Sequence, residues 1–387
     1  MLLVLSNLNA QITVTNLNAS GSGSLYDAIS QIATTGGTIN FDPSLSGEIS
    51  ISTSFPTITS EITINGNGKY ITEIDFNFAS RMFIVSGTGS LTINNFGLKR
   101  AGNNSTGGLF YVNNTTGGIT ANDVRIYLNK SISFVSSKGT LVINNSIIEA
   151  NGPLGGSYFF RSDWGNTPEG CPLNASFENK TIIKNSTISN NTAPMFWTER
   201  YVELENNIIK DNLAGTFGSF KGVNSYVFRN NTFSNSGSLN FSSWISTSTG
   251  SWDSKTLCSD HFLIDGNTFI GNGKINIPNY YGPSTTISNN SFDKSSISEY
   301  VNYESSRPPT FDSNSFTIFV NSSDGDDSTG DGSNSSPFKT FHKAYTQSSD
   351  GDRIKIVGII DWENSDETGD VINQGYVLNK DLTIQMG

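Results

Sequence analysis

The sequence predicts an all-β protein, a right-handed parallel β-helix in which one chain winds through about ten or more short coils. Three observations predict this fold: a six-residue pattern that recurs ten times, a composition suited to many tight turns, and a short apolar helix where a solenoid needs an end cap. Only 15% of the 387 residues are charged, and 38 are glycine. With 25 Phe and 13 Tyr, the chain has too many aromatic residues for a disordered protein.

The recurring pattern reads apolar, any residue, Asn (or Gly, Asp, Ser), small or polar, any residue, apolar. Its third position is occupied by Gly66, Asn95, Asp123, Asn145, Asn185, Asn206, Asn230, Gly266, Asn289 and Ser313. The basic step between copies is about 21–24 residues, and longer steps hold two coils or an insertion. This length fits a coil of three short strands. Leucine-rich repeats would need more leucine, and propeller blades would need about twice the period.

Each column of the pattern has a physical reason. A sharp bend between two strands needs a residue in the left-handed region, which Asn, Asp and Gly tolerate, so the third position predicts the bend. Stacked coils would bring these third-position side chains into register as a hydrogen-bonded ladder. The sixth position should point inward and stack on its own kind. It is occupied by Ile126, Ile148, Ile188, Ile209, Phe233, Phe269, Phe292 and Phe316.

The second position should face solvent just before the bend. In four successive copies it is occupied by Lys184, Glu205, Arg229 and Asp265. Coils stack about 4.8 Å apart, so opposite charges should alternate along the outside. An ion-pair file that adds a few tenths of a kcal/mol per pair is favoured here over a binding site.

Two segments have the sequence of a cap. Ser24 can N-cap a helix whose Leu25, Ala28, Ile29 and Ile32 form one apolar face, and this helix would cover the open end of the solenoid. The same order of features returns near residue 337, where Pro337 suits a first helical turn. We therefore expect a second solenoid to begin near residue 317 and to be cut short at the end of the chain.

These features divide the chain into three parts. Residues 1–10 are expected to be a signal-peptide remnant with Gln11 first in the mature chain, although a first buried strand is the alternative. Residues 11–316 should form the capped β-helix. Residues 317–387 should form a linker, a cap helix and the first strands of an incomplete second module.

The first residues of both predicted modules resemble known protein families. Residues 20–29, the segment Gly36–Asp42 and the run Ile62–Gly68 resemble the opening of secreted bacterial β-helix proteins of the pectate-lyase-like superfamily, in its polymorphic outer-membrane-protein and adhesin-like branch. Residues 318–341 resemble the opening of a second family of extracellular β-helices. The end of the leader resembles those of Bacteroidetes-type bacteria. The resemblance implies export from a Gram-negative cell, to the medium or the outer surface.

Composition excludes some functions. The net charge of −11 and the lack of a Lys/Arg cluster argue against nucleic acid, and no apolar run reaches the ~20 residues of a membrane span. The motifs of lyases and hydrolases on this fold are absent, and His261 and His342 have no triad-like context. The remaining catalytic candidates are Glu203, Glu205, Arg229 and Asp265, where Glu203 and Glu205 share one face of a strand.

Two expected insertions, at about 153–177 and 242–261, carry aromatic residues that could stack on sugar rings, or could pack the loops onto the solenoid. The candidate carbohydrate contacts are Tyr158, Arg161, Asp163, Trp164, Trp244 and Trp252. Cys171 and Cys258 could join the two insertions by a disulfide in an oxidising compartment.

An acidic, glycine-rich loop follows the first module. Asp324, Asp326, Asp327 and Asp331 could supply oxygen ligands to Ca²⁺, but the closing glutamate of an EF-hand is missing and a flexible linker is the alternative. Taken together, we expect a monomeric, secreted or cell-surface, adhesin-like scaffold that binds glycans or components of neighbouring cells. The alternative is a lyase or hydrolase that degrades polysaccharide.

Overall fold

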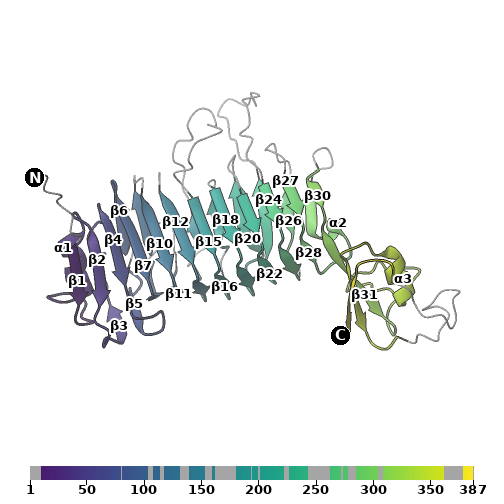
Figure 1. The fold of residues 1–387 in the computed structure, drawn as a ribbon, viewed down its shortest axis with the longest axis horizontal. Coiled ribbons are helices and arrows are strands. Elements are labelled where there is room, and N and C mark those ends of the chain that lie inside the picture. Colours follow the sequence, from purple (N-terminus) through teal and green to yellow (C-terminus); the bar gives the residue numbers. More distant parts are fainter. Residues whose placement is uncertain are drawn as a thin grey trace, which may run out of the picture.

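The computed structural model shows an elongated molecule of stacked coils (Figure 1). It describes residues 10–79, 81–102, 108–113, 117–130, 139–152, 159–161, 180–192, 194–198, 201–221, 226–242, 262–271, 273–277, 285–303, 308–360 and 378–386. Within these residues, no helix is long and apolar enough to cross a membrane.

Three stacks of parallel strands run along the solenoid. The first sheet contains β1 (Ala10–Val14), β2 (Gly37–Phe41), β4 (Glu61–Asn65), β7 (Ser90–Asn94), β10 (Gly118–Asn122), β12 (Thr140–Asn144), β15 (Lys180–Lys184), β18 (Tyr201–Glu205), β21 (Tyr226–Arg229), β24 (Phe262–Asp265), β27 (Thr285–Ser288) and β30 (Thr310–Asp312). Each strand pairs in parallel with the strand one coil away, so the predicted parallel β-helix is confirmed.

The second sheet holds the shorter strands that follow the predicted bend. Its members are β3 (Gly47–Ser50), β5 (Thr72–Asp75), β8 (Gly97–Lys99), β11 (Arg125–Tyr127), β13 (Ile147–Glu149), β16 (Thr187–Ser189), β19 (Ile208–Lys210), β22 (Thr232–Ser234), β25 (Thr268–Ile270), β28 (Ser291–Phe292), β31 (Ser315–Asn321), β32 (Arg353–Val357) and β33 (Thr383–Met386).

The third side is built from two sheets. One pairs β6 (Phe83–Ser86) with β9 (Phe110–Asn113), and the other contains β14 (Phe160–Arg161), β17 (Phe196–Thr198), β20 (Thr216–Lys221), β23 (Ser238–Ser242), β26 (Ile275–Ile277) and β29 (Val301–Tyr303). Phe159 and Phe160 are buried here in the core. The first expected insertion was therefore placed too broadly, because these two residues belong to a coil and not to an exposed loop.

The left-handed bend is confirmed in nine of the ten copies of the pattern. The third-position residues from Asn95 to Ser313 have φ between 50° and 65°, and only the weakest copy, at Gly66, lacks a positive φ. A second left-handed bend, which the sequence did not predict, directly follows the seven strands of the second sheet from β8 to β25. It falls at Arg100, Leu128, Ala150, Asn190, Asp211, Asn235 and Gly271.

The predicted ladder of third-position side chains is wrong by one residue. The left-handed residue directs its side chain outward, and the next residue turns into the bend. The ladder is therefore the buried Asn207, Asn231, Asn267 and Asn290 and the half-buried Asn314, where the Oδ1 of each of the last four accepts both the backbone N–H and the Nδ2–H of the preceding asparagine. A second buried ladder follows the second bend, through Asn129, Asn151, Asn191 and Asn212.

The inward file is confirmed in full. Strand pairing places Ile126, Ile148, Ile188 and Ile209 above one another and continues the file with phenylalanines. The rings of Phe233 and Phe269 are stacked with centroids 5.0 Å apart and planes 5° apart. Those of Phe269 and Phe292 lie 5.2 Å apart. Such an offset between successive rings is close to the strand spacing, so one aromatic residue per coil fills the corner.

The first cap is also confirmed. Helix α1 (Leu25–Ile32) starts after Ser24, whose hydroxyl accepts the N–H of Asp27 at 3.2 Å, and its Leu25, Ala28, Ile29 and Ile32 are buried. β1 begins at Ala10, so the strand includes the last residue of the expected leader remnant. Residues 1–9 lie outside the described part of the chain.

The second cap begins later than predicted. Helix α3 (Phe341–Gln347) is capped by Thr340, so Pro337 lies before the helix and not in its first turn. Asp327 explains the shift, because its carboxylate accepts the N–H groups of Lys339 (2.7 Å) and Thr340 (3.0 Å) and the Thr340 hydroxyl (2.6 Å). These bonds hold the chain extended up to Thr340.

A single strand joins the two parts of the molecule. The start of β31 pairs with β28 and its remainder pairs with β32, so it runs through the boundary expected at residue 317. Two separate cores flank it, and helix α2 (Ile297–Tyr300) packs beside the last coil of the first. The buried Asp352 accepts the N–H of Phe316 at 2.8 Å and that of Ser349 at 2.7 Å, and burial raises the pKa of its carboxyl. This carboxylate ties the second cap to the joint.

The buried ladder provides a direct test of this architecture. Asn231→Ala should lower the free energy of unfolding by about 2–5 kcal/mol, because the N–H of Asn207 and the carbonyl of Leu204 would lose their partner in the core. Asn230→Gly is the matched control, since Asn230 is exposed with φ 54° and glycine accepts that conformation at a cost under about 1 kcal/mol. Urea unfolding monitored by circular dichroism measures both, and equal losses would contradict the assignment.

Candidate functional site

The predicted column of alternating charges lies on the outer face of the first sheet. Strand register places Lys184 beside Glu205, Glu205 beside Arg229, and Arg229 beside Asp265. Lys184 Nζ lies 2.7 Å from both Glu203 Oε1 and Glu205 Oε2. The carboxylate of Asp265 instead accepts the Ser288 hydroxyl and the Asn289 amide, both at 2.8 Å.

The protonation states of this column do not suit acid catalysis. Burial alone would raise the pKa of Glu203, but its bonds from Lys184 and from the Tyr201 hydroxyl (2.9 Å) outweigh burial and lower it. Burial and the bond to Glu203 raise the pKa of Tyr201. Near neutral pH the carboxylate therefore stays ionised and the phenol stays protonated, so neither is a poised general acid or base.

The predicted glycan contacts fall mostly outside the described residues. This holds for Tyr158, Asp163, Trp164, Trp244 and Trp252, and equally for the cysteines at positions 171 and 258. The backbone of Arg161 lies in β14, in register with Trp197, and its side chain is not described.

The predicted calcium ligands are held apart by local bonds. Asp326 accepts the backbone N–H groups of Ser328 and Thr329, Asp331 accepts that of Ser333, and Asp327 binds the start of α3. Asp324 accepts the side-chain amide of Asn321 at 3.3 Å. The four carboxylates do not converge, and within the described ranges no three His, Cys, Asp or Glu side chains form a group that could hold a metal.

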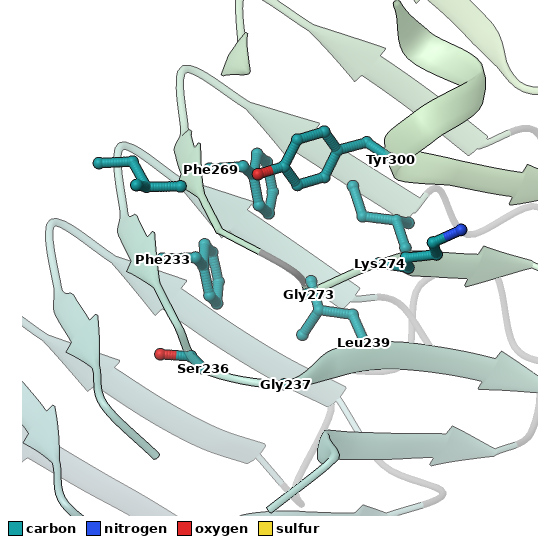
Figure 2. A pocket seen from close by; sticks show the side chains of 10 residues that line it. Phe233, Ser236, Gly237, Leu239, Phe269, Gly273, Lys274 and Tyr300 are labelled. Carbon is teal, nitrogen blue, oxygen red and sulfur yellow. The ribbon is translucent and has the colours of Figure 1, made fainter. Parts of the chain in front are cut away.

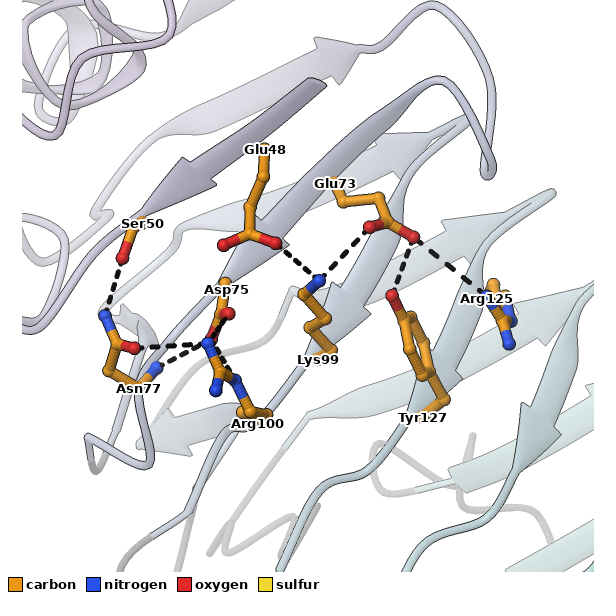
Figure 3. A network of polar contacts seen from close by, with 9 residues as sticks. All are labelled: Glu48, Ser50, Glu73, Asp75, Asn77, Lys99, Arg100, Arg125 and Tyr127. Carbon is orange, nitrogen blue, oxygen red and sulfur yellow. Dashed lines mark hydrogen bonds and ion pairs between the residues drawn. The ribbon is translucent and has the colours of Figure 1, made fainter. Parts of the chain in front are cut away.

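A charged network that the sequence reading missed covers the outer face of the second sheet, near its N-terminal end (Figure 3). Glu48 and Glu73 are in register on β3 and β5, where like charges repel. Lys99 resolves this repulsion, because its Nζ lies 2.5 Å from Glu48 and 3.2 Å from Glu73. The Glu73 side chain lies over Gly97, where an added Cβ would come within 2.8 Å of its Cγ.

Aromatic rings extend the network along the sheet. The Tyr127 hydroxyl donates to Glu73 at 2.6 Å, and Arg125 Nε donates to Glu149 at 2.7 Å. The Arg125 guanidinium lies 3.9 Å from the ring centroid of Tyr127 and 5.4 Å from that of Tyr70. Tyr70 is 62% exposed. Burial, followed by the bond to Glu73, raises the pKa of Tyr127 to about 12, so this phenol is protonated at neutral pH.

At the edge of the same face, Asp75 is fully buried and Arg100 covers it. Arg100 Nε donates to Asp75 at 2.7 Å, a second guanidinium nitrogen contacts the other carboxylate oxygen, and the Asn77 N–H donates at 3.0 Å. Burial opposes ionisation, but these bonds outweigh it and lower the pKa of Asp75 below its ordinary 3.8.

Cations from three coils gather around the loop that follows β5. Lys130 Nζ lies 4.0 Å from the ring centroid of Phe78, the Arg100 guanidinium lies 6.0 Å from the same ring, and the Arg81 guanidinium lies 4.5 Å from that of Tyr111. Within the described part of the chain, neither Arg81 nor Lys130 has a carboxylate partner. We call Tyr70, Phe78, Arg81, Tyr111, Arg125 and Lys130 the cation–aromatic face; it extends from the second sheet to Tyr111 of β9 on the third side.

One signal in the sequence could have located this face. Residues 69–138 contain seven Lys and Arg but only three Asp and Glu, in a chain whose net charge is −11. Strand register was still needed, because contacts such as Arg100 to Asn77 and Tyr127 to Glu73 join residues 23 and 54 positions apart.

A pocket also opens between coils farther along the solenoid (Figure 2). Its walls are largely apolar, with Phe233, Leu239, Phe269 and Tyr300 around the backbone of two glycines, and Lys274 stands at its rim. The Tyr300 hydroxyl is committed to Asp293 at 2.6 Å and to the Gly271 carbonyl at 3.0 Å. The walls of the pocket therefore offer few free polar groups to a ligand.

Comparisons with known proteins are sparse. No family model and no curated protein matches the chain. Among solved structures, the crystal structure of the Agl-KA catalytic domain aligns at 14% sequence identity with a TM-score of 0.32. The alignment covers 93% of this chain but spans only 64% of the length of that one, and a likeness of this degree carries no argument about function.

The buried ion pair predicts a pH dependence. Because the pKa of Asp75 is lowered on folding, its charge stabilises the fold above about pH 3.8, and this contribution is lost as the pH falls through the folded-state pKa. Asp75→Asn should lower the free energy of unfolding by about 1–3 kcal/mol at pH 7 and by progressively less below pH 3.8. Asp211→Asn, at an exposed bend, is the control. An Asp75→Asn deficit that persists at low pH would contradict the assignment.

Proposed function

We propose that this protein is a secreted or cell-surface, adhesin-like scaffold that binds an acidic glycan through the cation–aromatic face. The observation that carries the proposal is the placement of Arg81 and Lys130 over aromatic rings, with no carboxylate partner among the described residues. By contrast, Lys99, Arg100 and Arg125, on or directly after strands β8 and β11, each pair with at least one carboxylate.

Aromatic rings next to cations match an acidic sugar, which has an apolar ring face and a negatively charged group. The apolar face of a pyranose ring packs on an aromatic ring, and its carboxylate or sulfate accepts hydrogen bonds from guanidinium or ammonium groups. The half-exposed ring of Tyr70, held against Arg125, offers such a platform with little loss of side-chain freedom. A rigid solenoid would present several of these contacts to one extended polymer.

Catalysis is the less favoured function. A lyase requires a base that accepts a proton near neutral pH, but the pKa of Tyr127 is raised to about 12 and Glu73 is occupied by Lys99 and Tyr127. Glu203 and Glu205 both form salt bridges with Lys184, at 2.7 Å each. Binding without turnover is therefore the expected behaviour.

The proposal is tested by removing the unpaired cations. The double variant Arg81→Gln and Lys130→Gln should weaken binding to polygalacturonate or a sulfated polysaccharide by about tenfold, equal to ~1.4 kcal/mol. Affinity electrophoresis and calorimetry at two salt concentrations would measure it, and Tyr70→Ala should weaken binding at both.

The double variant Lys210→Gln and Lys274→Gln removes two exposed cations elsewhere and is the charge-matched control. It should bind within about twofold of the parent protein. Equal loss in both double variants would mean that only net charge matters and would refute the assigned face. Release of unsaturated or reducing ends from the bound polymer would overturn the non-enzymatic function.

A further inference from the structure

The first sheet carries a second regular surface, on its outer face from β2 to β12. Two files of outward side chains run across these strands, which lie side by side in Figure 1; the asparagine file spans all five strands, and the threonine file spans the first four and meets Val142 on β12. One file is Thr38, Thr63, Thr92 and Thr120, and the other is Asn40, Asn65, Asn94, Asn122 and Asn144. The strands pair without a register shift, so the two files form a lattice, which we call the Thr–Asn face.

The asparagine file is locked in place by its own hydrogen bonds. Each Nδ2 donates to the Oδ1 of the asparagine one coil before it, at distances of 2.8, 2.7, 2.9 and 3.1 Å along the file. An amide has two N–H donors and two acceptor lone pairs, so each interior amide keeps one of each for an external partner. Their rotamers are fixed in advance, which lowers the entropy lost on binding.

The threonine file is free to bond outward. None of its four hydroxyls bonds another protein group within the part of the chain that the structure describes. A β-branched side chain in a strand has restricted χ1, so hydroxyls and methyl groups are presented in a fixed, repeating order. The face therefore offers donors, acceptors and methyl groups at regular intervals.

The composition of these files changes abruptly along the same sheet. From β2 to β12 they contain no charged or aromatic side chain, and Glu61 lies beside them only at the start of β4. From β15 onward the same two files hold Lys184, Glu203, Glu205, Arg229 and Asp265. The strand geometry is unchanged, so the fold itself does not impose the uncharged surface.

The lattice dimensions narrow the choice of partner. Neighbouring groups in a file are ~4.8 Å apart, and the two files are separated by two residues of a strand, ~6.6 Å. A single hydrogen bond to such a surface contributes little, so only an extended, uncharged partner with a matching repeat would be held. Sugar polymers are disfavoured because the face has no aromatic ring on which a pyranose could pack.

Ordered water has the required chemistry. In ice every water molecule donates and accepts equally, and its oxygen repeat is close to the spacing of parallel strands. We propose that the Thr–Asn face binds the surface of ice. This site is separate from the cation–aromatic face and does not depend on the proposed glycan binding.

The test is incorporation of the full chain into ice grown slowly from a dilute solution, together with the thermal hysteresis of that solution. The parent protein should be enriched in the ice fraction. Thr92→Lys, at the centre of the face, should abolish the enrichment and the hysteresis. Thr286→Lys occupies the same file on β27, where the neighbouring file carries Asp265 and Asp312 on the adjacent strands, and should retain both.

Thr92→Val removes the hydroxyl but keeps the shape of the side chain, and it should reduce enrichment without changing the melting temperature of the protein. It keeps the test decisive if the lysine variant does not fold. Exclusion of the parent protein from ice, or equal behaviour of the position-92 and position-286 lysine variants, would overturn the proposal. Binding to crystalline cellulose but not to ice would also overturn it, in favour of an uncharged polysaccharide.

Discussion

The structure depends on how the buried backbone N–H and C=O groups at each bend find hydrogen-bond partners. Where a coil turns from the first sheet to the second, the N–H that follows the left-handed residue has no strand partner and is buried. From Asn207 onward it is bonded by the asparagine of the next coil, whose Nδ2 also bonds a main-chain carbonyl of the coil before. Unpaired, each such group would cost about 1–3 kcal/mol, a large share of the stability of any coil. The bends therefore set the register, and register places every outward side chain.

Because the register is fixed, different residues at equivalent positions of successive coils give the solenoid several different surfaces. The same positions of the first sheet hold amides in the early coils and salt-bridged charges in the later ones. On the second sheet, Glu48 and Glu73 are tolerated side by side because Lys99 reaches both of them. Side chains on this solenoid contact residues within one or two coils, so distant stretches of the surface can differ without disturbing one another.

The strand β31 also serves two purposes, because it belongs to both stacks of coils. One strand ends the first stack and begins the second, and the buried Asp352 bonds the backbone at the crossing. Beside it, Thr317 Oγ1 is the one buried side-chain polar atom without a partner in the described part of the chain. The two cores meet at a single shared strand, so the bonds of Asp352 help to fix where the second module starts.

The parallel β-helix, the nine left-handed bends, the inward file from Ile126 to Phe316 and the first cap could all be predicted from the sequence, because each repeats or follows from local chemistry. That prediction misplaced the ladder by one residue, since only the path of the bend decides which side chain turns inward. It set the second cap too early, because Asp327 holds Thr340 from thirteen residues away. The repeat predicted that the position before each bend faces solvent, but only the tertiary structure brought together the cation–aromatic face and the bonded asparagines of the Thr–Asn face, because stacking joins residues that lie a coil or more apart in the chain.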